Sequence, residues 1–373
     1  MVITFPRMGN ICLAAKAFFE AAGIPYVVPE KINKQTLING AAVSPEDICL
    51  PFKIFMGSYS DCIKKGADTI LMTGSCGPCR FGEYCELQMK LLKNTKPYKQ
   101  TVVIDAPASV GKKEFLRRIG VISKASPLSG IHQLRALKQA IHILSLADEL
   151  DEKAHWLAGY EVNKSSCKSI LMNAHNDAEN CRTPDVMQQT LEHYTAQLHA
   201  IKTDSSKQPI KVALIGEIYS MIEPFANLFI EEKLMDLGVS SRRMITPSWW
   251  LKDLAAKPMG LNSLSVNKAA RHFLPYNTGG HARESIGHAL LCQEQGFDGA
   301  IQIYPLGCMP EIVVKAMLPS MQRRINFPVL TLVIDEMTGE AGYETRIEAF
   351  IDMLQMRRKK GVITRDKRIV SGN

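Results

Sequence analysis

Short apolar segments alternate with helical segments in two separate stretches of the chain. In the first stretch, the expected strands are VITF (2–5), YVVP (26–29), TILMT (69–73) and TVVID (101–105). Helices are expected near 12–22, 53–65 and 80–93. Apolar strands linked through helices are typical of a parallel sheet with helices on its faces. The first hundred residues are therefore expected to form a Rossmann-like lobe.

The alternation returns after residue 207. The expected strands there are VALIGE (212–217), RMIT (243–246), GAIQIYP (299–305) and VLTLVID (329–335), with helices near 224–237, 281–295 and 344–357. Between the two stretches, 131–150 and 185–201 carry apolar residues at helical spacing. We expect an α/β fold with two Rossmann-like parallel-sheet lobes and a helical insertion between them. The expected divisions are an N-terminal lobe (1–107), a helical segment (108–207), a C-terminal lobe (208–358) and a basic tail (359–373).

Net charge and hydropathy narrow the expected location and partners. The formal net charge is +8, and the stretch from Arg357 to Arg368 supplies six of these charges through seven basic residues and one acid. A solvated helix end explains such a tail most simply, and docking to an acidic partner is the main alternative. No role with nucleic acid is expected. No run approaches the roughly 18 apolar residues of a membrane span. MVITFPRMGN lacks the features of a secretion signal, so a cytoplasmic protein without membrane contact is expected.

Ten cysteines are many for a chain in a reducing compartment, where thiols more often bind metals or do redox chemistry than form disulfides. The densest group is Cys76, Cys79 and Cys85 in TGSCGPCRFGEYC, directly after strand 69–73. In open α/β sheets, ligands bind at this carboxyl end of the strands. The Cys-x-x-Cys spacing lets two sulfurs meet at one metal or cluster. The start of the following helix favours thiolate.

Two further cysteines share a local pattern. Cys49 in ICLPFK and Cys308 in LGCMPEI are each followed by a proline two positions later. Proline suits the first turn of a helix, so each cysteine is expected near an N-cap with its sulfur directed out of the helix start. Four thiolates facing one cleft, from Cys49, Cys76, Cys79 and Cys308, would suit a [4Fe–4S] cluster.

Other interpretations of the cysteines stay open. Structural zinc, a dithiol redox pair and plain packing all produce an isolated Cys-x-x-Cys, although zinc usually requires a second close Cys/His pair. Cys85 is expected to pack against the lobe rather than to bind. The remaining cysteines, Cys12, Cys62, Cys167, Cys181 and Cys292, are isolated and are expected to be core or surface thiols.

Several polar residues follow the C-terminal strands. Glu217 lies just past strand 212–217, where a carboxylate would either cap the next helix or anchor a ligand. Asp335, Glu336 and Thr338 follow strand 329–335, and Thr345 with Glu348 fits a capping box.

Long segments resemble a known family. CLPFKIFMGSY, KGADTILMTGSCGPCRFGEYCELQ, GEIYSMIEPFAN, GFDGAIQIYPLGCMPEIV and LTLVIDEMTGEAGYETRIEAF are similar to CoA-enzyme-activase-related proteins, which are relatives of 2-hydroxyacyl-CoA dehydratase subunits and double-cubane cluster proteins. The resemblance covers roughly residues 1–105 and 210–358. It implies two lobes around a cysteine-bound iron–sulfur cluster, typically in anaerobes, with Cys49, Cys76, Cys79 and Cys308 as ligands.

The resemblance also implies a partner, a dimeric ATP-hydrolysing iron–sulfur activator that supplies low-potential electrons, and it allows a homo- or heterodimer. The expected function is an iron–sulfur redox protein that takes these electrons and reduces a small substrate or relays them. A 2-hydroxyacyl-CoA dehydratase-like subunit and a non-catalytic zinc scaffold are the alternatives. An [8Fe–9S] double cubane would need about six cysteine ligands. Catalytic residues and the substrate are not assigned, so an enzymatic activity stays open.

Overall fold

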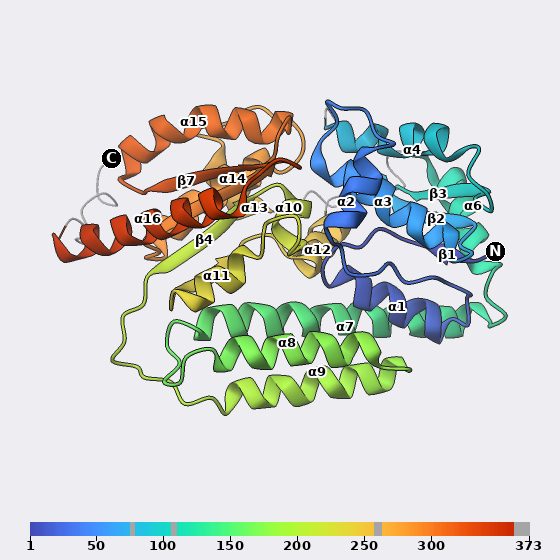
Figure 1. Cartoon of the computed structure of the whole chain (residues 1–373), viewed down its shortest axis with the longest axis horizontal. Helices are drawn as coiled ribbons and strands as arrows, with labels where there is room; N and C mark the ends of the chain where they lie inside the picture. The colour runs from blue at the N-terminus through green and yellow to red at the C-terminus, as the bar shows by residue number, and fades with distance from the viewer. Residues whose placement is uncertain (75–78, 106–109, 257–262, 362–373) are drawn as a thin grey trace.

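The computed structural model describes residues 1–74, 79–105, 110–256 and 263–361. It confirms the α/β class, because two parallel sheets are each covered by helices and a helical layer runs beneath both (Figure 1). No helix in the described ranges is long and apolar enough to cross a membrane.

The N-terminal lobe contains a parallel sheet in the order β1-β2-β3, formed by β1 (Ile3–Thr4), β2 (Thr69–Thr73) and β3 (Gln100–Ile104). Its helices are α1 (Ile11–Ala21), α2 (Lys34–Ala41), α3 (Leu50–Lys64), the 3₁₀ turn η1 (Arg80–Glu83), α4 (Tyr84–Leu92) and α6 (Lys112–Ser123). The expected strand at 26–29 is wrong, because only Tyr26 forms a bridge, to Ile3. One bridge does not extend a sheet, whatever the local β propensity.

The C-terminal lobe contains a parallel sheet in the order β5-β4-β6-β7. The strands are β4 (Lys211–Gly216), β5 (Ser240–Arg243), β6 (Gly299–Pro305) and β7 (Val329–Ile334). Every residue of β6 is buried, as expected for an interior parallel strand with helices on both faces. The helices are α10 (Ile218–Ile222), α11 (Ile230–Asp236), α12 (Pro247–Ala256), α13 (Leu264–Ala270), α14 (Ala282–Glu294), α15 (Met309–Ile325) and α16 (Glu340–Lys359).

Two expected helix starts in this lobe are wrong. The helix expected from residue 224 begins only at Ile230, because Leu228 and Phe229 adopt positive φ and break any earlier helix. The last helix begins at Glu340, so Thr345 lies inside it and donates a hydrogen bond to the Ala341 carbonyl instead of forming a capping box.

The helical layer consists of α7 (Gly130–Leu157), α8 (Ser166–Asn180) and α9 (Pro184–His199). Buried alanines, among them Ala147, Ala154 and Ala174, line its core and permit close helix packing. The long helix α7 contacts α1 of the first lobe and β5 of the second, so it lies along both lobes (Figure 1).

One hydrophobic core continues from the first lobe into the second. Phe55 on α3 packs edge-on against Tyr219 on α10, with ring centroids 4.9 Å apart. At its margin, the buried Lys53 pairs with Glu336 in the loop after β7. The Gly9 N–H donates to the Glu223 carboxylate at 3.1 Å. These contacts join the two lobes along one interface.

Substituting Gly9 tests this interface between the lobes. Gly9 has φ +49°, and a Cβ there would lie 2.3 Å from the Ile222 carbonyl oxygen. Gly9→Ala is therefore expected to lower the free energy of unfolding by about 2 kcal/mol, measured by urea denaturation. Gly130→Ala is the matched control, because no atom lies within 4 Å of its added Cβ. Equal stability of the two variants would contradict the close approach.

Candidate functional site

Three of the four cysteines expected to bind a cluster are described, and each is the N-cap of a helix. Cys49 caps α3, Cys79 caps η1 and Cys308 caps α15, with the proline of each Cys-x-Pro pattern in the first turn. The expected position at helix starts is thus confirmed. Cys76 lies outside the described residues.

The three thiols lie near one another although two belong to the first lobe and one to the second. Cys79 acts electrostatically on both Cys49 and Cys308, and Glu217 acts on all three. The backbone N–H groups of Phe81 and Glu311 face the Cys79 and Cys308 sulfurs and lower the pKa of these thiols, although neither sulfur makes a regular cap hydrogen bond. The helix starts therefore direct N–H donors at these sulfurs, which favours thiolate.

Tyr84 and Arg80 lie beside these cysteines. We call Cys49, Cys79 and Cys308, together with Tyr84, Arg80 and Glu217, the cysteine locus. The Tyr84 hydroxyl contacts the Cys49 sulfur. The Arg80 guanidinium donates to the Asp47 carbonyl at 2.8 Å and to the Gly307 carbonyl at 3.1 Å. Asp47 and Gly307 precede Cys49 and Cys308 closely in the chain. One cation thus holds together the two loops that carry these cysteines, and its charge lowers the pKa of Cys49 and of Cys79.

Glu217 has a structural partner for its carboxylate. Its oxygens accept the N–H groups of Tyr219 and Ser220 at 3.0 and 2.9 Å, so it caps α10, one of the two roles that the sequence allows. Burial raises its pKa, which the two N–H donors oppose. The same carboxylate lies near the three thiols, so the cap also places a carboxylate beside the cysteine locus.

Burial raises the pKa of Cys49, Cys79 and Cys308, and Arg80 opposes this for Cys49 and Cys79. Neutral thiols at pH 7 therefore need a bound metal to become thiolates. Among the residues that the structure describes, no group of three or more His, Cys, Asp or Glu side chains is arranged to hold a metal ion. The donor types fit a soft metal centre, but the described sulfurs do not converge on a single ion.

The other cysteines occupy different environments. Cys85 lies in the core of the first lobe, where burial raises its pKa to about 12 and where the charged groups near it are Asp105, Arg118 and Glu86. Cys12, Cys62, Cys167, Cys181 and Cys292 are buried and free. All six are buried, as is usual for cysteines that pack in a core.

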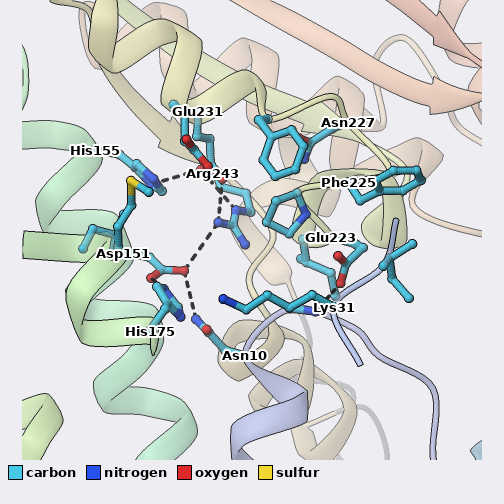
Figure 2. A pocket seen from close by; sticks show the side chains of 18 of the residues that line it. Asn10, Lys31, Asp151, His155, His175, Glu223, Phe225, Asn227, Glu231 and Arg243 are labelled. Atoms are coloured by element: carbon cyan, nitrogen blue, oxygen red, sulfur yellow. Dashed lines mark hydrogen bonds and ion pairs between the residues drawn. The ribbon is translucent and has the colours of Figure 1, made fainter. Parts of the chain in front are cut away.

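A cavity of about 400 Å³ lies where both lobes meet the helical layer. Arg243 from the end of β5 pairs with Glu231 on α11 at 2.6 Å and approaches Asp151 on α7 at 3.6 Å (Figure 2). Asp151 also contacts His175 on α8 at 2.7 Å. This network forms one wall of the cavity, and Glu223 and Phe225 lie on the opposite side (Figure 2).

The sequence does not predict this cavity or the contact of the Tyr84 hydroxyl with the Cys49 sulfur. Glu223 stands in GEIYSMIEPFAN, six residues after Glu217, and the Glu-Pro pair after a short helix is the only local signal. Arg7, Asp151 and Arg243 come from three distant parts of the chain and belong to no shared motif. Only the fold brings them together.

Alkylation of the metal-free chain tests the environment of the thiols. Cys308 is 8% exposed and burial raises its pKa, so iodoacetamide should label it at least about tenfold more slowly than free cysteine at neutral pH. Cys79 is more exposed and should react faster than Cys308. Both rates should rise with pH as thiolate forms. Site-resolved mass spectrometry measures them, and fast labelling of Cys308 at neutral pH would contradict its burial.

Comparison with models of protein families gives a match. Residues 8–76 match a family model described as a CoA enzyme activase uncharacterised domain, and this segment contains α1, α2, α3 and β2 together with Cys49. No curated protein matches the chain. Over this N-terminal segment, the chain is similar to that uncharacterised domain of CoA enzyme activases.

Proposed function

We propose that this protein is an iron–sulfur redox protein whose cluster is held between the two lobes by Cys49, Cys76, Cys79 and Cys308. The observation that supports the proposal best is the position of the described cysteines. The three thiols lie at helix N-caps that come from both lobes. They interact electrostatically with one another and with Glu217, and Arg80 acts on Cys49. The fourth ligand, Cys76, lies outside the described residues.

The arrangement of the described cysteines favours a cluster over a single zinc ion. Four sulfurs around one zinc, each about 2.3 Å from it, lie within about 4 Å of one another. The described cysteines interact electrostatically but form no group that would hold one ion. In a [4Fe–4S] cluster each cysteine binds a different iron, so the sulfurs stand farther apart. This supports a [4Fe–4S] cluster. A double cubane would need further cysteines, and the described residues bring no others to these helix starts.

The residues of the chain would set the properties of the cluster. When bound, the cluster supplies one-electron chemistry at a potential that its surroundings tune. Burial of Cys49 and Cys308 keeps water away from two sulfurs. This lowers the reduction potential, because added negative charge on the cluster is then less well solvated. The N–H donors at Phe81 and Glu311 and the Arg80 cation act in the opposite direction by stabilising added negative charge. The Tyr84 hydroxyl would donate to the Cys49 thiolate.

The electron donor that we propose is an ATP-dependent iron–sulfur activator, and the setting is the cytoplasm of an anaerobe. The support is the resemblance of both lobes together with the matched segment at 8–76. With electrons from this donor, the protein would reduce a small substrate or relay them.

Metal analysis of anaerobically purified protein tests the proposal. We expect about four irons and four sulfides per chain. Cys308→Ser should lose most of the iron, because it removes the one ligand from the second lobe. Cys292→Ser is the control, since this thiol is buried in the same lobe but away from the locus. Zinc without iron would overturn the redox proposal, as would full iron content in Cys308→Ser.

Electron paramagnetic resonance tests the proposed donor. The oxidised protein is mixed with an activator of this family, ATP and dithionite under argon. A new cluster signal should appear only when all three are present. Omitting ATP is the control. An unchanged spectrum in a protein that contains iron would exclude this activator as the donor.

A further inference from the structure

We propose that the cavity between the lobes and the helical layer binds a small organic ammonium compound, with Glu223 as its counter-ion and an apolar wall around its body. This site is separate from the cysteine locus and goes beyond the proposed redox function. Its volume of about 400 Å³ lies in the range of small-molecule sites.

The carboxylates of the cavity differ in one respect. Five line it, and four of them have an ion-pair partner: Asp151 with His175 and Arg243, Glu179 with Arg7 and Lys31, Glu231 with His155 and Arg243, and Glu232 with Lys168. Within the part of the chain that the structure describes, Glu223 makes no ion pair. It is only 4% exposed.

The contacts of Glu223 are neutral. Its Oε2 accepts the Gly9 N–H at 3.1 Å, and the backbone N–H of Phe225 also faces the carboxylate. Arg7 is near enough to attract it, but the Arg7 guanidinium makes its own contacts with Glu179 and the Pro29 carbonyl. A buried carboxylate without a direct cation is costly, and a bound ammonium group would remove this cost.

The Lys and Arg side chains that line the cavity already have carboxylate partners, so the cation for Glu223 would come from a ligand. Arg7, Lys31, Lys168 and Arg243 each face at least one other carboxylate, and five Asp/Glu stand against these four Lys/Arg. Among the described residues, Glu223 is the carboxylate of the lining that has no ion-pair partner, which favours a cation over an anion as the ligand. An anionic ligand could pair with one of these cations only by breaking an ion pair that the cation already makes.

The wall beside Glu223 suits the apolar body of such a ligand. Phe225 lies next to it (Figure 2), and Phe229, Ile32 and Met172 also line the cavity. Phe229 is 40% exposed, which leaves apolar surface at the cavity for a ligand to cover. Aromatic rings also attract an ammonium group through their faces.

Calorimetric titration of the full chain with n-butylammonium tests the site, and butyrate serves as the probe of equal size and opposite charge. We expect butylammonium to bind and butyrate not to bind. Glu223→Gln removes the charge but keeps an oxygen for the Gly9 N–H, so the chain should fold and lose about tenfold or more in affinity. Glu232→Gln is the matched control in the same cavity, because the Glu232 charge is already paired. It should change the affinity less than threefold or so.

Three results would overturn the inference: no butylammonium binding, equal binding of butyrate, or equal losses in Glu223→Gln and Glu232→Gln. Thermal unfolding of both variants checks that they are folded. The titration needs no iron, so its failure would leave the redox proposal standing, and failure of the metal analysis would leave this site standing.

Discussion

The contact between the two lobes is the constraint on which both candidate sites depend. A continuous apolar core, with Phe55 against Tyr219, fixes the lobes in one relative position. Because both sheets are parallel, the loops after their strands carry the polar and thiol side chains to this interface. Gly9 permits a close approach of the backbones, since no side chain fits between it and Ile222. The cysteine locus and the cavity lie at two places along the same interface, and α10 runs between them, with Glu217 beside the thiols and Glu223 at the cavity.

The two sites meet the cost of burial in different ways. At the cysteine locus, burial raises the pKa of each thiol, and Arg80 is the cation that acts on Cys49 and Cys79. A metal centre would supply the missing positive charge and hold the sulfurs as thiolates. In the cavity, four carboxylates have ion-pair partners, and Glu223 has none among the described residues. In each case the proposed ligand provides the charge that the chain lacks.

The sequence predicted those features that depend on neighbouring residues. Strands 69–73 and 299–305 were expected with the bounds that the structure has, because continuous apolar runs between helices permit few alternatives. The helix starts at Cys49 and Cys308 followed from a proline that fixes the first turn. The prediction of a strand at 26–29 was wrong, because a strand also needs a neighbouring strand that pairs with it along its length. The Glu223 cavity combines residues from three parts of the chain, which local patterns do not relate.

The location of iron in the anaerobic protein is the most direct test of the central claim. Crystals diffracting at the iron absorption edge would show it as an anomalous peak. The account predicts one compact peak within bonding distance of sulfurs from both lobes, including that of Cys308. Iron held by the thiols of only one lobe, or an edge signal from zinc at this position, would contradict it.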